Sequence, residues 1–311
     1  MVLPFAYLNF AVPKWGAVML RKLCRLVLVS VLLVPVAVRG QGLNTSAIDR
    51  ALGRSGQKAG EVYRVGFPRT DLQVVVQGVS VKPGLALGSW AAFSGTDENA
   101  TVMGDLVLLD AEVNPVLKKL RSSGFEITAV HNHLLGETPH VMYMHYIGHG
   151  GAAQLAETLR AALTASKTPL ERPAAPAPEP ATAPDWVKTV TDTIGRQGTF
   201  RGGVLSFGLA RSEAIAEGGM TLTSPQGVAE SINVQEAGAG KVAATGDFVL
   251  TADEVNPVIS ALEEHHILIT ALHSHLLTEQ PRVFFMHFWA ADNTASVAAG
   301  IKAALSHIAL K

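Results

Sequence analysis

The segment Gly104–His145 reads GDLVLLDAEVNPVLKKLRSSGFEITAVHNHLLGETPHVMYMH, and Gly246–His287 reads GDFVLTADEVNPVISALEEHHILITALHSHLLTEQPRVFFMH. Aligned without a gap at an offset of 142 residues, 22 of these 42 positions are identical, far more than unrelated chains share. The second half of the chain is therefore a copy of the first. Both copies retain His-x-His, and both retain a third histidine twelve residues further on.

Length and composition agree with two packed domains. At 311 residues, a typical domain size of about 150 residues gives two domains. A hydrophobic content of 48% with 16% charged residues is ample for packed cores. The net charge of -1, with no Lys/Arg-rich run after the N-terminal segment, argues against nucleic acid as a partner. The sequence indicates no oligomeric state.

The N-terminal segment has the charge order of a secretory signal. Arg21, Lys22 and Arg25 precede an apolar run over residues 26–38, and Arg39-Gly40-Gln41 follows. We expect residues 1–40 to be a signal peptide cleaved near Gly40, with residues 1–18 untranslated if Met19 is the start. The alternative is an uncleaved membrane anchor, although the run is short for a bilayer. Export predicts a periplasmic or secreted protein that has no stable membrane insertion after cleavage.

The rest of the chain divides into two modules and a linker. The predicted first repeat module covers residues 41–166, and the second covers residues 186–311. Residues 167–185 are rich in Pro and Ala, a composition typical of an extended linker. The single cysteine, Cys24, precedes the apolar run, so the mature chain offers no thiolate ligand and no disulfide.

Each copy predicts the same order of strands and helices, from β-branched runs between breakers and from apolar residues at helical spacing. The strands of the first copy are Leu72–Val81, Leu85–Phe93, Thr101–Leu109, Phe125–Leu134 and Val141–Ile147, with helices through Val116, Leu117 and Leu120 and through Leu155, Leu159 and Leu163. The second copy repeats the pattern. The predicted fold class is α+β: two homologous β-β-β-α-β-β-α modules with mainly antiparallel sheets, forming an intramolecular pseudo-dimer.

The repeated histidines are the candidate metal ligands. Side chains alternate along a strand, so His131 and His133 project to one face, as do His273 and His275. Each pair is spaced closely enough to converge on one ion. His145 and His287 are the candidate third ligands. They share that face if the hairpin turn has an odd length, which places His145 opposite Ala129, and point away if it has an even length.

Glu112 and Glu254 are the candidate fourth groups, as ligands or general bases. The competing interpretation is a capping box, in which the glutamate accepts a hydrogen bond from the cap amide. The Asn-Pro pairs at 114–115 and 256–257 favour a helix that starts later, which would leave the glutamates in a loop. We expect a turn role for Asp105 and Asp247, and solvated positions for Glu137 and Glu279.

The motifs resemble a known bacterial family. GDLVLLDAEVNPV, TAVHNHLL and PHVMYMH, with the second-copy forms GDFVLTADEVNPV, TALHSHLL and PRVFFMHFWA, are similar to the exported proteins typified by the mycobacterial lipoproteins LppY and LpqO. The resemblance extends from about residue 47 to the C-terminus. It implies a domain of unknown function and export, but no substrate and no catalytic residues. No Cys follows the apolar run, so lipid anchorage is not expected.

Two functions of different class follow. The first is a metal-dependent envelope enzyme, a hydrolase with zinc on one or both triads and Glu112 or Glu254 assisting. The second is a non-catalytic module that binds a small envelope ligand, with the histidines as hydrogen-bonded cleft walls. The chain has no HExxH helix and no Gly-rich phosphate loop, so the enzyme hypothesis rests on the histidines alone.

Overall fold

A computed structural model gives the structure, and it describes residues 42–171 and 182–311. The predicted signal peptide and residues 172–181 of the predicted linker lie outside the described residues. Both repeats belong to one compact unit that begins at Gly40. Within the described part of the chain, no helix is long and apolar enough to cross a membrane.

The two repeats contain matching elements in the same order. The first contains α1 (Thr45–Leu52), β1 (Gln57–Ala59), β2 (Val62–Pro68), β3 (Val75–Val76), β4 (Val79–Ser80), α2 (Pro83–Ala86), β5 (Gly88–Gly95), β6 (Ala100–Leu109), α3 (Asp110–Ser122), β7 (Glu126–His131), β8 (Val141–Gly150) and α4 (Ala152–Leu163). The second contains α5 (Asp185–Ile194), β9 (Thr199–Arg201), β10 (Val204–Ala210), β11 (Ala216–Glu217), β12 (Met220–Thr221), the 3-10 turn η1 (Ser224–Gln226), β13 (Ala229–Gly238), β14 (Lys241–Leu250), α6 (Ala252–Glu264), β15 (Leu268–His273), β16 (Phe284–Asn293) and α7 (Thr294–Leu305).

The strands form two six-stranded sheets of the same topology, together with two short two-stranded ladders. The order is β1-β2-β5-β6-β8-β7 in the first sheet and β9-β10-β13-β14-β16-β15 in the second, and every neighbouring pair is antiparallel. The predicted α+β class with mainly antiparallel sheets is confirmed. The repeated segment quoted above spans most of β6, α3, β7 and the first half of β8, and the corresponding part of the second repeat.

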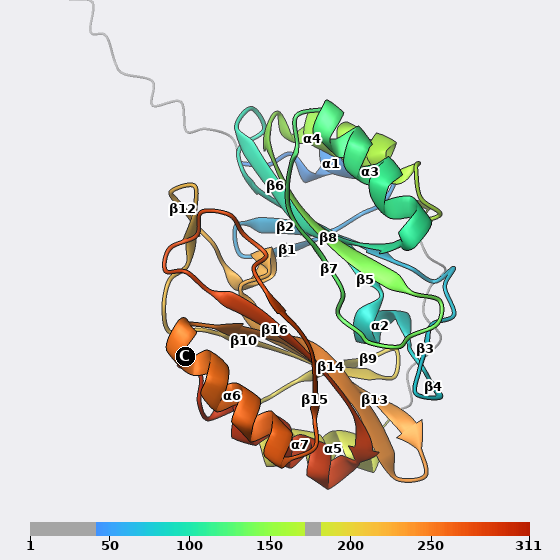
Figure 1. The fold of residues 1–311 in the computed structure, drawn as a ribbon. Helices are drawn as coiled ribbons and strands as arrows, with labels where there is room; N and C mark the ends of the chain where they lie inside the picture. The colour runs from blue at the N-terminus through green and yellow to red at the C-terminus, as the bar shows by residue number, and fades with distance from the viewer. Residues whose placement is uncertain (1–41, 172–181) are drawn as a thin grey trace, which may run out of the picture. The chain divides into compact units, whose positions relative to one another are not determined.

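Helices cover one face of each sheet, as Figure 1 shows for α3 and α4 over the first sheet and α6 and α7 over the second. The core beneath α1, α3 and α4 contains residues of the first repeat only, and the core beneath α5, α6 and α7 contains residues of the second only. Two further apolar clusters mix residues of both repeats, such as Tyr143 with Trp289 and Met103 with Phe285. The opposite sheet faces are therefore buried against the other repeat.

The region before β5 differs from the prediction. Leu72–Val81 was expected to be one strand, but it folds into the two-residue strands β3 and β4. The reason is a tight turn: Gln77 and Gly78 both have positive φ, at 48° and 82°, as a two-residue hairpin turn requires. Leu85 lies in α2, which begins at Pro83. Strand β2 was not predicted.

The structure decides between the two starts of α3 that the sequence left open. The helix begins at Asp110 and carries Pro115 in its interior, so the Asn-Pro pair does not mark the first helical position. The Glu112 carboxylate accepts a hydrogen bond from the backbone N–H of Leu109 at 2.9 Å, and Glu254 does the same for Thr251 at 2.8 Å. The capping interpretation of the two glutamates is therefore correct.

Part of the predicted linker packs on the first repeat. The backbone N–H of Lys167 donates to Glu112 Oε1 at 2.7 Å, and Arg54 donates to the carbonyl of Pro169 at 3.1 Å. Helix α5 begins at Asp185, one residue before the predicted start of the second module.

Candidate metal centre at the junction of the repeats

The register of the β7–β8 hairpin decides where the third histidine points. Ala129 pairs with His145 and His131 pairs with Tyr143, so His131 and His145 lie on one face of the sheet. The second hairpin has the same register, with Ala271 opposite His287. The odd-length turn is therefore confirmed in both repeats.

The six histidines form one cluster and not two separate triads. Three ring pairs join the repeats: His131 with His273 at 3.7 Å between centroids, His133 with His287 at 3.8 Å, and His145 with His275 at 3.8 Å. At the offset of 142 residues, exchanging the repeats turns the second pair into the third and leaves the first pair unchanged. The sequence left open whether the two triads meet, and they do, because the buried sheet faces bring both histidine sets together.

Aromatic side chains flank the cluster. Tyr143 stacks on His133 with centroids 3.5 Å apart, and its equivalent Phe285 stacks on His275 at 3.7 Å. These contacts fix the planes of the two imidazoles that follow the ends of β7 and β15. In metal sites, neighbouring groups fix the ring orientation of a histidine so that one nitrogen points at the ion.

The nitrogen atoms of the cluster are divided between two roles. All six Nε2 atoms are buried and without a hydrogen-bond partner. Several Nδ1 atoms lie near backbone carbonyls: Nδ1 of His131 is 3.3 Å from the oxygen of Asn132, and Nδ1 of His273 is 3.2 Å from that of Ser274. A ring that donates its Nδ1–H to a carbonyl keeps the Nε2 lone pair free, which is the tautomer that binds a metal.

Burial favours the neutral form of five of the imidazoles. Removal from water lowers the pKa of His145 to about 3 and that of His273 to about 4, and it lowers the pKa of His131, His133 and His275 as well. Neighbouring histidines add to this effect for His131, because a second positive charge in the cluster is unfavourable. Neutral imidazole is the form that coordinates a metal ion.

Asp105 and Asp247 belong to the same site, which the sequence did not predict. Asp105 pairs directly with His145 in the ladder between β6 and β8, and Asp247 pairs with His287 in the second sheet. Both lie within a strand, so the expected turn role is wrong. Asp105 Oδ1 is buried without a hydrogen-bond partner, 3.8 Å from Nε2 of His145, and Asp247 contacts Nδ1 of His287. The available signal was the recurrence of Gly-Asp at equivalent positions.

The glycine before each aspartate has a steric reason. A Cβ atom on Gly104 would lie 2.1 Å from the carbonyl oxygen of Trp90, and one on Gly246 would lie 1.9 Å from that of Ser231. Neighbouring strands approach too closely there for any side chain. The Gly-Asp pair thus keeps the strand in the position from which the aspartate faces the histidines.

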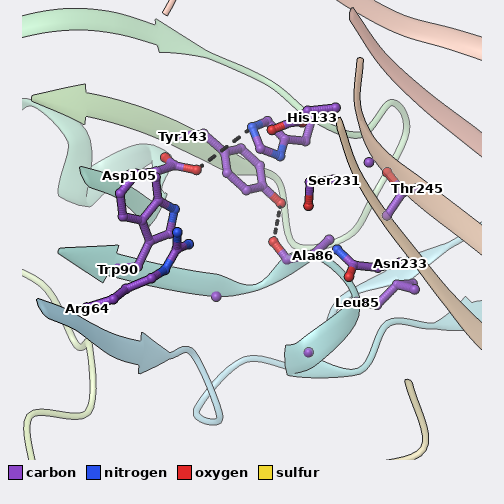
Figure 2. Close-up of a pocket in the computed structure, with 14 residues that line it drawn as sticks. Arg64, Leu85, Ala86, Trp90, Asp105, His133, Tyr143, Ser231, Asn233 and Thr245 are labelled. Atoms are coloured by element: carbon purple, nitrogen blue, oxygen red, sulfur yellow. Dashed lines mark hydrogen bonds and ion pairs between the residues drawn. The ribbon is translucent and has the colours of Figure 1, made fainter. Parts of the chain in front are cut away.

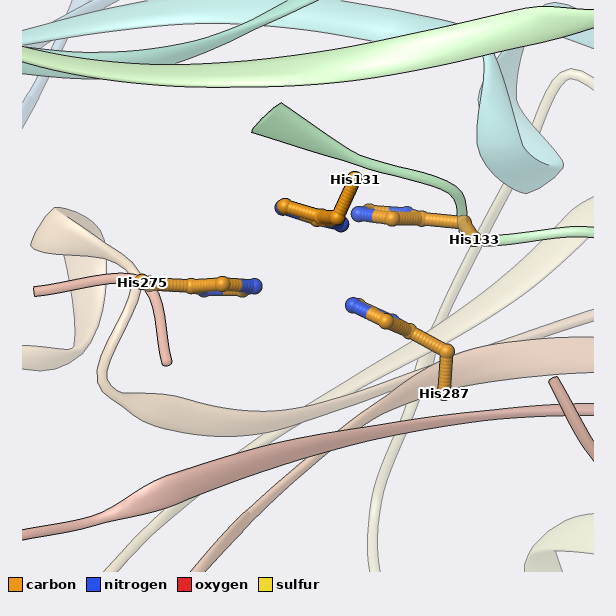
Figure 3. Close-up of side chains that lie close together, drawn as sticks. All are labelled: His131, His133, His275 and His287. Atoms are coloured by element: carbon orange, nitrogen blue, oxygen red, sulfur yellow. The ribbon is translucent and has the colours of Figure 1, made fainter. Parts of the chain in front are cut away.

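Two groups of atoms are suitable for holding an ion, and Figure 3 shows the four histidines of the first. The first takes His131 and His133 from one repeat and His275 and His287 from the other, and the second combines Asp105, His133 and His145. Within each group, one ligand atom per residue lies within 4.8 Å of every other. These clusters are able to bind a metal, and the first needs both repeats.

Glu112 and Glu254 are engaged elsewhere. Arg69, whose side chain is fully buried, donates to Glu112 Oε2 at 2.7 Å and to the carbonyl of Val107 at 2.8 Å. Arg211 forms the equivalent pair with Glu254 at 2.8 Å. Neither glutamate belongs to the two groups of potential ligands in the described residues. Their retention in both copies is explained by a helix cap joined to a buried ion pair.

Glu137 and Glu279 were expected to be solvated, but both are buried. Each accepts a hydrogen bond from the first residues of the following strand: Glu137 from the N–H of Val141 at 3.2 Å, and Glu279 from the N–H of Val283 at 3.3 Å. They therefore fix the hairpin connections that lead to the third histidines.

A cavity of about 260 Å³ opens beside the cluster (Figure 2). Its wall contains His133, Asp105 and Asp247 from the candidate centre and Arg64 and Trp90 from the first repeat. Polar residues of the second repeat complete it, namely Ser231, Asn233 and Thr245. A small molecule in this cavity would lie next to an ion held by His133.

A family model described as Domain of Unknown Function (DUF1259) matches residues 46–165 and again residues 188–307. The chain belongs to this family. The two matches confirm the internal repeat and contain all six histidines and both aspartates. The relation to the LppY and LpqO lipoproteins stays a prediction. No curated protein matches the sequence significantly.

The similarities to solved structures are weak. A trimeric bacterial microcompartment shell protein, PduB, aligns over 81% of this chain and 89% of its own with 11% identity and a TM-score of 0.20. EtuB from Clostridium kluyveri aligns over 80% and 90% with 10% identity and a TM-score of 0.18. TP0453 aligns over 82% and 96% with 11% identity and a TM-score of 0.17. With TM-scores this low, these similarities say nothing about the function of this chain.

Proposed function

We propose that the protein binds a divalent metal ion, zinc, at the histidine cluster, and that the two repeats act there as an intramolecular pseudo-dimer. One observation carries the proposal: six buried Nε2 atoms and Asp105 Oδ1 lie together without hydrogen-bond partners. An unpaired buried polar atom costs about 1–3 kcal/mol, so a cluster of them is unstable unless something binds there.

The choice of zinc follows from the ligand chemistry. Neutral imidazoles and a carboxylate suit zinc in a tetrahedral site, and the described residues contain no cysteine that would favour softer ions. Ligand atoms around tetrahedral zinc lie about 3.3–3.4 Å apart when the bonds are about 2.0–2.1 Å. The present ligand atoms lie within 4.8 Å of one another, so zinc binding would require side-chain rotations that draw them closer together.

The pseudo-dimer is supported by the pairing of the rings. His131 and His273 form a pair of equivalent residues, while the other two pairs exchange with each other between the repeats. A twofold relation between the repeats produces this pattern. Neither repeat alone supplies the four histidines of the first group.

We propose hydrolysis as the activity. A divalent ion at this position supplies a Lewis acid that lowers the pKa of a coordinated water to about 7. The cavity next to His133 and Asp105 provides the place for a small substrate. Asp105 replaces Glu112 as the carboxylate of the site, because Glu112 is paired with Arg69. The alternative, a non-catalytic binding module, uses the same centre and cavity without turnover.

We also propose that the protein works outside the cytoplasm, in the periplasm or the medium. The basic, apolar and small residues of segment 21–41 support this proposal. The N-terminal mass of protein isolated from its host tests it: a mature chain starting near Gln41 supports export, and an intact N-terminus in the membrane fraction contradicts cleavage.

Metal analysis of protein purified without a His tag tests the central proposal. We expect at least one equivalent of zinc per chain, retained through gel filtration. The variant His133→Ala with His275→Ala should lose it, while the control His149→Ala with His307→Ala, both exposed, should keep it. Unchanged zinc in the first variant would show that the cluster is not the binding site.

A further inference from the structure

We propose that the cavity beside His133 binds a small ligand with a carboxylate or phosphate group, and that Arg64 holds this oxyanion on one side of the centre only. The inference deepens the proposed function and rests on it for the metal ion next to the cavity. It assigns the ligand class and says which of the two repeat-related sides is open.

Arg64 provides the positive charge. Its guanidinium lies over the ring of Trp90, 3.9 Å from the centroid, and its Nη1 donates to the carbonyl of Pro225 in the other repeat at 2.7 Å. These two contacts hold the group at the cavity wall. Burial lowers the pKa of Arg64 to about 10, so the guanidinium remains charged at neutral pH.

Arg64 differs from the buried arginines Arg69 and Arg211. Arg69 and Arg211 are each paired with two or more carboxylates. Among the described residues, none forms an ion pair with Arg64. A partly buried guanidinium without a carboxylate partner, facing a cavity, is suited to an oxyanion that arrives from solution.

Asp105 connects the cavity with the candidate metal centre. This residue is 6% exposed, lines the cavity, and has an unpartnered Oδ1 atom. Figure 2 shows its carboxylate between Arg64 and the ring of His133. The cavity therefore places the Arg64 guanidinium, which the Asp105 carboxyl group attracts, beside the candidate metal ligands.

The repeat-related side of the centre has no arginine equivalent to Arg64 and no equivalent polar wall among the described residues. From the sequence offset and the strand register, the equivalents of Arg64, Tyr143, Asn233 and Thr245 are Ser206, Phe285, Ala92 and Met103. Trp90 and Ser231 are equivalent to each other, and both line the cavity. Met103 and Phe285 belong to an apolar cluster of buried residues. The polar wall thus exists on one side, and its counterpart is packed core.

Glycines keep the cavity open. Gly84 and Gly88 line it, and their equivalents are Gln226 and Ala229. Gln226 is 3% exposed, and its amide lies 3.7 Å from the sulfur of Met103, in the space that corresponds to the cavity. The repeats have therefore diverged so that one side admits a ligand and the other is filled by side chains.

The lining defines the ligand. Arg64 and the hydroxyl and amide groups of Ser231, Asn233 and Thr245 line a cavity of about 260 Å³. Leu85, Ala86 and Trp90 form the apolar part of its wall, and Asp105 and Asp247 add two carboxyl groups. A polar molecule with one anionic group and hydroxyl or amide groups fits this chemistry. A long acyl chain does not, because it needs a predominantly apolar pocket.

Calorimetric titration with inorganic phosphate and, separately, with acetate tests the inference, using zinc-loaded and chelator-treated protein. We expect one of the two anions to bind. Arg64→Met should weaken that binding at least tenfold with the zinc content unchanged. Gly84→Gln introduces into the cavity the side chain that Gln226 has at the equivalent position, and it should weaken anion binding to the same extent. Ser206→Ala, at the equivalent position, is the control and should have no effect.

The outcomes separate the two proposals. Binding of phosphate alone or acetate alone supports the inference and identifies the kind of oxyanion. The oxyanion proposal is wrong if neither anion binds to the zinc-loaded protein, or if Arg64→Met and wild type bind the anion with equal affinity. Neither result contradicts the metal centre. If the protein holds no zinc but Arg64→Met still weakens anion binding, the proposed metal centre is wrong and the proposed anion site is supported.

Discussion

His131 and His273 occupy equivalent positions in the two repeats, and the centroids of their rings lie 3.7 Å apart. The contact joins two residues that are 142 positions apart in the chain, and the other four histidines surround it. The repeats therefore share one centre.

Because the repeats share one centre, removing histidines from either repeat should release the bound zinc. His131→Ala with His133→Ala should remove most of the bound zinc, and so should His273→Ala with His275→Ala, because each pair removes at least one ligand of the shared first group. Metal content by plasma mass spectrometry measures this. If each double variant kept half of the metal, the repeats would hold independent sites.

Glu112→Gln should destabilise the fold and leave zinc binding intact. The substitution leaves Arg69, which is 0% exposed, with Asp71 as its remaining carboxylate. Breaking a buried ion pair costs roughly 3–5 kcal/mol, and we expect the lower end because Asp71 stays. Urea unfolding measures the loss, and zinc content of the folded protein is the control. Full stability combined with lost activity would instead assign Glu112 a catalytic role.

Gly246→Ala should be much more harmful than Gly208→Ala. The new Cβ would lie 1.9 Å from the carbonyl oxygen of Ser231 in the first case, and nothing lies within 4 Å in the second. Forcing atoms into a packed site costs about 1–3 kcal/mol or more, and the shift of β14 would also displace Asp247. Urea unfolding midpoints and zinc affinities of the two variants test this. Equal behaviour would contradict the steric argument for Gly-Asp.

Acid should destabilise the metal-free protein. The pKa of His145 falls to about 3 and that of His273 to about 4 in the fold, against about 6.5 in the unfolded chain. The unfolded state thus binds more protons below pH 6.5. Stability is complete above that pH and is lost as the pH falls toward the folded values, by up to about 1.4 kcal/mol per pH unit for each histidine.

Thermal unfolding of chelator-treated protein between pH 7 and pH 5 measures this loss. His273→Gln should flatten the pH dependence, because one buried imidazole no longer resists protonation. His307→Gln, at an exposed position, should leave it unchanged. A midpoint that is constant over this range would contradict the burial of neutral imidazoles.

Several features were predictable from local sequence. The hairpins with their histidines and the helices α3 and α4 follow from alternation and helical spacing, which are local properties of the chain. The run 72–81 was mispredicted because a turn at Gln77-Gly78 overrides its β-branched residues. Glu112 was ambiguous because its true partner, Arg69, is 43 residues away and nothing local marks the pair.

The sequence by itself determined the duplication, the fold class and the identity of the histidines, because a repeat preserves both apolar periodicity and polar residues at fixed spacing. Only the tertiary structure decided that the two histidine sets meet, that Asp105 and Asp247 join them, and that one side is open at Gly84 while Gln226 fills the other. The reason is physical. Contacts between buried sheet faces depend on how two modules pack, and spacing within one module does not encode that packing.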